Sequence, residues 1–196
     1  METLLPLLGF VLVSTFTPGP NNLMVLTSGA NFSLAPTIPH ILGICFGFPV
    51  LIVAVGLGLG FVFDAYPVVH EILKYAALVY LLWLAWRIAL AGRPEAGSAG
   101  ARPLTFLQAA AFQWVNPKAW ALVFGAMALY TTAGGNRAFE IGLIAVLFGL
   151  LCLPNGVVWA LFGRAIAGFL ENDSQRRWFN IAMAALLVVS VLPTMF

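Results

Sequence analysis

The sequence predicts an all-α integral membrane protein with six transmembrane helices, arranged as two inverted three-helix repeats. The first observation is composition: of 196 residues, 62% are hydrophobic and 8% are charged, and the mean hydropathy is +0.99. A soluble domain carries about 25% charged residues, and a soluble chain of this size could not bury so much apolar surface. The second observation is that six apolar segments reach the roughly 20 residues that a helix needs to cross a bilayer. The third is that proline motifs recur at matching places in the two halves of the chain.

The six predicted helices are separated by polar or Gly/Pro-rich stretches. They run over about 4–28, 38–63, 68–90, 104–130, 139–162 and 178–196. The longest polar stretch, residues 91–103, is rich in Gly, Pro, Ala and Ser and is typical of a flexible linker. The single transmembrane domain therefore divides into a first repeat at 1–90, a cytoplasmic linker at 91–103 and a second repeat at 104–196.

The repeat is predicted from proline positions. The first helix contains Pro18-Gly19-Pro20 and the fourth contains Asn116-Pro117, while Pro49 and Pro154 interrupt the second and fifth. A unit of three crossings reverses direction when it is duplicated, so these halves are expected to be inverted, as in many secondary transporters. The alternative is that proline is simply frequent in membrane helices.

Basic residues predict the orientation of the chain. Lys74 and Arg137 fall on the side of the N-terminus. Six arginines fall on the opposite side: Arg87, Arg93, Arg102, Arg164, Arg176 and Arg177. Because cytoplasmic loops carry the excess of Lys and Arg, both termini are expected in the periplasm, with the chain multi-pass in a bacterial inner membrane. The N-terminus lacks the basic region of a signal peptide, so the first helix is expected to be retained.

The first candidate site is the run Thr17-Pro18-Gly19-Pro20-Asn21-Asn22. Proline lacks an N–H group and clashes with the preceding turn, so the first helix is expected to break here and restart near Pro20. Irregular backbone at membrane depth persists only inside protein or beside a water-filled cavity. The break is therefore predicted to present free N–H groups and a positive helix end to a ligand; the alternative is a structural kink.

The second candidate site is the run Gln113-Trp114-Val115-Asn116-Pro117-Lys118. Asn followed by Pro is a helix-start signal, because Asn caps the helix and Pro occupies its first position. Lys118 is ionisable near the middle of a predicted helix, where a charge costs about 2.5–3.5 kcal/mol. No carboxylate is expected near it, which favours a binding role; the alternative is snorkelling of the long side chain to an interface.

The two breaks are expected to meet near the membrane midplane. Two helix N-termini and one ammonium group would then suit a carboxylate. The amides of Asn21, Asn22, Gln113, Asn116 and Asn155 are expected to bind the remaining polar groups of that ligand. No catalytic residue, cofactor or metal ligand set is predicted, since the chain shows no HExxH, P-loop or nucleophile-elbow motif.

Five further residues are given structural interpretations. Gly43 and Gly47 are expected to allow close helix packing. Cys45 and Cys152 lie in apolar runs and are interpreted as buried free thiols. His40 is expected at the membrane interface. The modest net charge of +2 does not indicate nucleic-acid binding.

TPGPNN in the first helix and NPKAW in the fourth resemble the LysE-type family of amino-acid exporters. KYAALVYLLWLAWRIA at 74–89 and VVWALFGRAI at 157–166 are also similar to that family. The resemblance spans essentially the whole chain, and TPGPNN with LAWRIA is most similar to the cysteine/O-acetylserine branch. One departure is the segment 31–36, which reads NFSLAP where the family usually has a basic loop.

The resemblance implies efflux of a small neutral amino acid, driven by the proton gradient and without an enzymatic step. The substrate is expected to be cysteine/O-acetylserine-like or threonine/homoserine-like, the other partner is the lipid bilayer, and a homodimer is left open. The motif positions carried over are Pro18, Gly19, Pro20 and Asn21 in the first break and Asn116, Pro117 and Lys118 in the second. The alternatives are a metal-ion efflux transporter, which needs Cys, His and carboxylate ligands, and a non-transporting membrane assembly protein.

Overall fold

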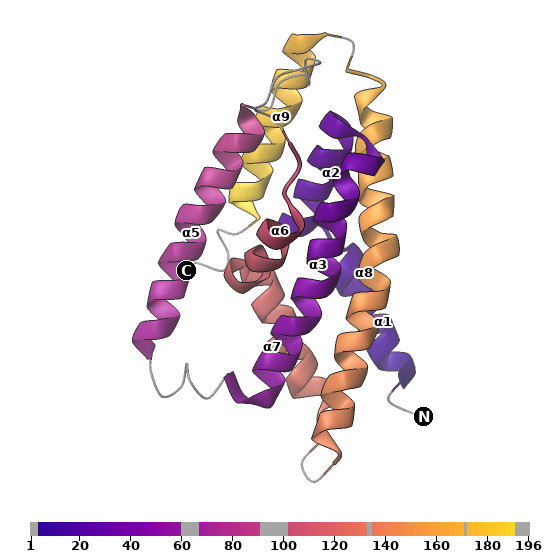
Figure 1. Ribbon diagram of the computed structural model, residues 1–196, viewed down its shortest axis with the longest axis vertical. Helices are drawn as coiled ribbons and strands as arrows, with labels where there is room; N and C mark the ends of the chain where they lie inside the picture. The colour runs from indigo at the N-terminus through magenta and orange to yellow at the C-terminus, as the bar shows by residue number, and fades with distance from the viewer. Residues whose placement is uncertain (1–3, 60–66, 91–101, 133–134, 171, 191–196) are drawn as a thin grey trace.

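The computed structural model describes residues 4–59, 67–90, 102–132, 135–170 and 172–190, and within these ranges it is built of helices without strands (Figure 1). The first half contains α1 (Leu4–Phe16), α2 (Pro20–Phe32), α3 (Leu34–Ala54), the π-helical turn η1 (Val55–Leu59) and α5 (Pro67–Ala89). The second half contains α6 (Phe106–Phe112), the 3-10 turn η2 (Gln113–Val115), α7 (Pro117–Tyr130), α8 (Arg137–Ala167) and α9 (Asp173–Val189).

The first predicted helix is broken at the proline motif, as expected. α1 ends at Phe16, α2 begins at Pro20, and the two are bent by 52°. Neither proline donates a backbone hydrogen bond, so the ladder of the helix cannot cross this segment. Gly19, at the start of α2, has a φ of 177°, which is extended backbone.

The second predicted break is also present. α6 begins one residue after Thr105, whose hydroxyl accepts from the Gln108 N–H while the Gln108 side chain accepts from the Thr105 N–H. This capping box sets the start of the helix, which is therefore Phe106 and not Leu104. The helix then tightens into η2, and α7 restarts at Pro117 behind its cap, Asn116.

The helices of the two halves run in opposite directions (Figure 1). α1, α2 and α5 rise in this view and α3 descends, whereas α7 and α9 descend and α8 rises. α3 packs on α8, α2 also packs on α8, α6 packs on α3, and α5 packs on α9.

Glycines allow these helices to approach closely. A Cβ added at Gly29 would collide with the backbone of Ala160, and one added at Gly163 would collide with the Leu26 carbonyl, so α2 and α8 are almost in backbone contact. Gly43 and Gly47 of α3 lie in the same way against Phe106 and Ala110 of α6. The packing role predicted for Gly43 and Gly47 is confirmed, and small residues at helix interfaces are typical of membrane bundles.

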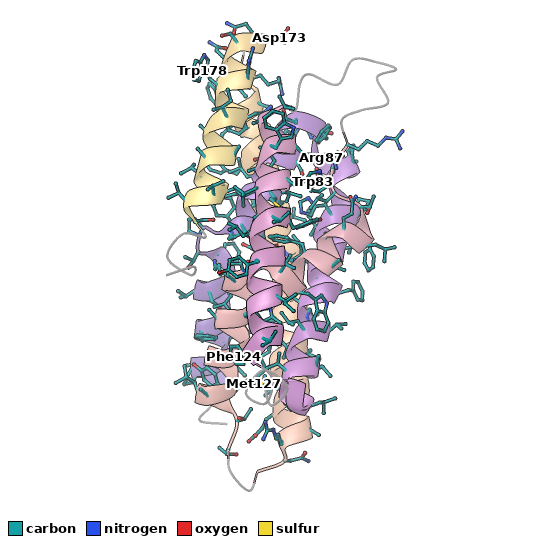
Figure 2. All side chains as sticks on the ribbon, turned by 90° about the vertical axis from the view of Figure 1, so that its left-hand side faces the viewer. Trp83, Arg87, Phe124, Met127, Asp173 and Trp178 are labelled. Carbon is teal, nitrogen blue, oxygen red and sulfur yellow. The ribbon has the colours of Figure 1, made fainter. Side chains whose placement is uncertain are left out.

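Within the described part of the chain, two helices are long and apolar enough to cross a membrane on their own, Leu34–Gly58 and Arg137–Ala167, and the bent pair α1–α2 qualifies as a third if it forms one span. The exposed apolar side chains around these helices would face lipid (Figure 2). Most of the predicted linker, residues 91–101, lies outside the described residues.

His40, expected at the membrane interface, is enclosed by the protein. Its side chain is fully buried, and the Nδ1 atom lies 3.2 Å from Ser28 Oγ. The reason is that α3 begins at Leu34, so that His40 is nearly two turns inside the helix and faces α2.

Candidate functional site

A cavity of about 50 Å³ lies where the two broken helices meet α3 and α8. Its polar wall is formed by Ser14, Thr15, Gly19, Asn21, Asn22, Asn116, Lys118 and Asn155. Its apolar wall includes Val25, Ile41, Ile44, Phe48 and Leu122. No carboxylate of the described residues lines this cavity, so among them it is a small pocket with one cation and several amides.

Lys118 reaches across from α7 to the first break. Its Nζ atom donates to the Thr17 carbonyl at 2.6 Å and lies 3.4 Å from the Pro18 carbonyl. These carbonyls follow the last turn of α1, where helix carbonyls lack partners and the helix dipole is negative. The ammonium group is thus held by carbonyl oxygens of the first break. An ammonium group has three N–H donors, so one remains for a ligand.

Gly19 is required by the path of the Lys118 side chain. A Cβ at this position would lie 2.6 Å from Lys118 Cδ and 3.1 Å from its Nζ. Because the φ of Gly19 is extended, the reason for glycine is space and not backbone conformation. Gly19 also offers no side chain to cap α2, and the next residue, Pro20, has no N–H. The first N–H groups of α2 are therefore left without a side-chain cap beside the cavity.

A chain of hydrogen bonds joins the first break to α8. Asn22 Nδ2 donates to the carbonyls of Thr15 and Thr17, at 2.7 and 2.9 Å. Asn155 Nδ2 in turn donates to Asn22 Oδ1 at 2.9 Å. Asn22 and Asn155 are each only 5% exposed. Thr17 is the shared element, because its carbonyl accepts from both Asn22 and Lys118.

A second pair of amides ties the two breaks together. Asn21 and Gln113 exchange two hydrogen bonds, at 2.9 and 3.1 Å, and Gln113 Nε2 also donates to the Ala109 carbonyl. Asn116 accepts from the Lys118 N–H at 3.2 Å and so caps α7, as its place before Pro117 predicts. These amides hold the start of α2 and the start of α7 at one place.

The structure brings six of the predicted site residues to the cavity wall: Gly19, Asn21, Asn22, Asn116, Lys118 and Asn155. The other five shape the breaks behind this wall: Thr17, Pro18, Pro20, Gln113 and Pro117. Sequence reasoning missed Ser14, Thr15 and Cys152 as lining residues. Cys152 precedes Asn155 by three positions, which puts both on one helix face and could have indicated its place.

The two cysteines are free and buried, as predicted. They form a side-chain contact between the centres of α3 and α8. Within the described ranges, no three His, Cys, Asp or Glu side chains come close enough together to hold a metal ion. The described part of the chain therefore offers no support for the metal-transport alternative.

Comparison with known proteins adds the family. Residues 12–191 match the family described as LysE type translocator. Relatives named cysteine/O-acetylserine efflux protein, from Escherichia coli (strain K12) and Shigella sonnei (strain Ss046), are 30% identical over 185 residues. The alignments cover 91% of this chain and 90% of each relative. No solved structure matches.

The match covers both breaks, the cavity and most of the helices that surround them. It agrees with the resemblance of TPGPNN and NPKAW to the LysE-type exporters. The chain belongs to the LysE type translocator family.

Proposed function

We propose that this protein is a secondary exporter of a small neutral amino acid or amino-acid derivative in the bacterial inner membrane. The observation that carries the proposal is the cavity between the two breaks, with Lys118 in its wall and no carboxylate among the described residues that line it. In our proposal the ammonium group of Lys118 and the uncapped N-terminus of α2 bind the substrate carboxylate. A cation and free helix N–H groups are the pair of features that suits such an anion.

The lining of the cavity supports a small, uncharged side chain. Val25, Ile44, Phe48 and Leu122 form its apolar wall. Phe48 packs edge-to-face on Phe148, with ring centroids 5.0 Å apart, and this contact restricts the movement of its side chain. A second cation on the substrate would have no carboxylate partner there. The relatives named for cysteine and O-acetylserine efflux favour these two compounds over threonine or homoserine.

The proposed site consists of the residues of both breaks together with Asn155. Substrate contact is assigned to Gly19, Asn21, Asn22, Asn116, Lys118 and Asn155. Support of the break geometry is assigned to Thr17, Pro18, Pro20, Gln113 and Pro117. Residues of the first group line the cavity, and residues of the second group do not.

Transport requires each side of the cavity to open in turn. On one side, α2 is held by the near-backbone contact with α8 and by two hydrogen bonds to α9. Asn31 Nδ2 donates to Asn180 Oδ1 at 2.8 Å, and Arg176 donates to the Ala30 carbonyl. On the other side, α1 is held to α7, where Tyr130 Oη donates to the Pro6 carbonyl at 3.2 Å. We propose that the repeats at 1–90 and 104–196 rock against each other to break these contacts alternately, driven by the proton gradient.

The positions of the arginines support a proposed orientation of the chain in the membrane. Arg87 lies toward the same end of the molecule as Asp173 and Trp178, at the start of α9, while Phe124 and Met127 of α7 lie toward the other end (Figure 2). Arg176 and Arg177 lie in the first turn of α9. We propose that this arginine-bearing end is cytoplasmic, which puts both termini in the periplasm.

Counterflow in proteoliposomes tests the proposal. Purified protein is loaded with unlabelled compound and offered labelled cysteine, O-acetylserine, threonine, leucine, lysine or a divalent metal ion. We expect accumulation of cysteine and O-acetylserine, and its loss in Lys118→Met, which keeps the length of the side chain but removes its charge. Well-folded protein that exchanges metal ions, or no amino acid, would overturn the proposal.

A further inference from the structure

One buried acceptor at the cavity has no partner among the described residues. Asn155 on α8 is 5% exposed and lines the cavity. Its Nδ2 atom donates to Asn22 Oδ1, but its Oδ1 atom has no hydrogen-bond partner. An unpaired buried acceptor is costly, and unpaired polar groups at a cavity often mark the place of a ligand.

The orientation of the Asn155 amide is determined by its neighbours. Asn22 Nδ2 faces two carbonyls, those of Thr15 and Thr17, and a carbonyl accepts but cannot donate. Asn22 must therefore present its amide nitrogen to the break and its Oδ1 to α8. Asn155 must then present its nitrogen to Asn22, because two facing oxygens would repel. The free atom of Asn155 is consequently an oxygen, and it can be satisfied only by a donor.

The donors of the protein that lie nearest along this network are already used. Asn22 Nδ2 is bound to two carbonyls. Lys118 Nζ is bound to the Thr17 and Pro18 carbonyls, and its third N–H is assigned to the substrate carboxylate. The missing donor must therefore come from what enters the cavity. A carboxylate offers no donor, whereas an ammonium group offers three.

We propose that Asn155 Oδ1 is the subsite for the α-ammonium group of the substrate, and that Lys118 takes the carboxylate of the same molecule. The inference rests on the proposed function and adds the direction in which the substrate lies. Hydrogen bonds through the Thr17 carbonyl and Asn22 connect Lys118 to Asn155. The site therefore recognises a zwitterion, with a cation facing the carboxylate and a neutral oxygen facing the ammonium group.

This arrangement predicts selectivity against carboxylic acids without an amino group. Such a compound can still bind Lys118, but it leaves Asn155 Oδ1 unpaired. Hydrogen bonds to charged groups contribute enough that one of them changes affinity by about tenfold or more. Wild-type protein is thus expected to bind L-cysteine at least about tenfold more tightly than 3-mercaptopropionate, which is cysteine without the amino group.

The test is competition binding to purified protein in detergent under reducing conditions, with labelled L-cysteine as the probe. Asn155→Leu, which keeps the approximate size of the side chain, is expected to bring the affinity ratio of L-cysteine to 3-mercaptopropionate close to one. Asn155→Ala removes the same acceptor without added branching and serves where the Leu variant does not fold. Asn180→Leu is the matched control, because Asn180 also forms a buried hydrogen bond with another asparagine but does not line the cavity. It is expected to keep the wild-type ratio.

The outcomes separate this inference from the proposed function. Wild-type protein that binds L-cysteine and 3-mercaptopropionate equally well overturns the ammonium subsite and leaves the carboxylate site intact. Asn155 variants that weaken the binding of both compounds by the same factor also overturn the ammonium subsite, because an equal loss indicates a structural role for Asn155. Wild-type protein that binds neither compound contradicts the proposed substrate class, and the inference falls with it.

Discussion

Replacing Gly19 by alanine tests whether the position of the Lys118 side chain determines substrate binding. The added Cβ would lie 2.6 Å from Lys118 Cδ. Non-bonded carbon atoms prefer about 3.5–4.0 Å, so the Lys118 stem must move by about 1 Å. A shift of that size takes Nζ from 2.6 Å to beyond hydrogen-bond reach of the Thr17 carbonyl.

The expected loss can be worked from this geometry. A hydrogen bond to a charged group contributes about 1.5–3 kcal/mol. At 1.4 kcal/mol for each factor of ten, misplacing the Lys118 ammonium group should weaken substrate binding by about 10- to 150-fold. Stability should fall little, because the side chain that yields is long and flexible.

Equilibrium binding of labelled O-acetylserine, with thermal unfolding in the same detergent, measures both effects. Gly9→Ala is the matched control, since it lies in α1 and an added Cβ there meets nothing within 4 Å. The reasoning is refuted if Gly19→Ala binds as tightly as Gly9→Ala. It is also refuted if the loss of binding only follows a large fall in the unfolding temperature.

Three further substitutions test separate parts of the account. Gly163→Ala should lower the free energy of unfolding by about 1–3 kcal/mol, because the added Cβ overpacks α2 on α8. Gly142→Ala should not, because its Cβ meets nothing within 4 Å. Equal thermal unfolding midpoints for the two variants would contradict the close packing. Asn116→Ala should lower the free energy of unfolding by about 1 kcal/mol through loss of the α7 cap. Asn116→Ser, which can still cap the helix, should recover most of this loss in thermal unfolding. An unfolding midpoint that Asn116→Ala leaves unchanged would mean that the cap contributes nothing to stability. Phe48→Ala should enlarge the cavity and let leucine compete for O-acetylserine binding, and failure of leucine to compete would show that Phe48 does not limit substrate size.

Local backbone chemistry made the two breaks predictable from the sequence. Proline cannot donate a helical hydrogen bond and is favoured at a first helical position. Pro20 and Pro117 therefore indicated where α2 and α7 begin, and the structure agrees. Thr105 and Gln108 carried an equally local signal, the capping box, which places the start of α6 two residues later than hydropathy alone suggests.

The partners of the site residues were less accessible to sequence reasoning. Lys118 was expected to meet helix N-termini, but its nearest partners are carbonyls at the end of α1, about 100 positions away in the chain. Which end of a broken helix a long side chain reaches depends on how the two halves pack, and no local pattern records that. His40 shows the same limit, because its burial follows from α2 lying over α3.

Cysteine accessibility tests the central claim, that the substrate binds between the two breaks. The chain has two cysteines, and Cys152 lines the cavity. In a Cys45→Ser variant, Cys152 is the only target for a small alkylating reagent such as N-ethylmaleimide, and O-acetylserine can be added without introducing a competing thiol. The account predicts that O-acetylserine slows alkylation of Cys152 in a saturable way, and that this protection disappears in Lys118→Met. An alkylation rate that saturating O-acetylserine leaves unchanged, while the same protein still exchanges O-acetylserine in counterflow, would contradict it.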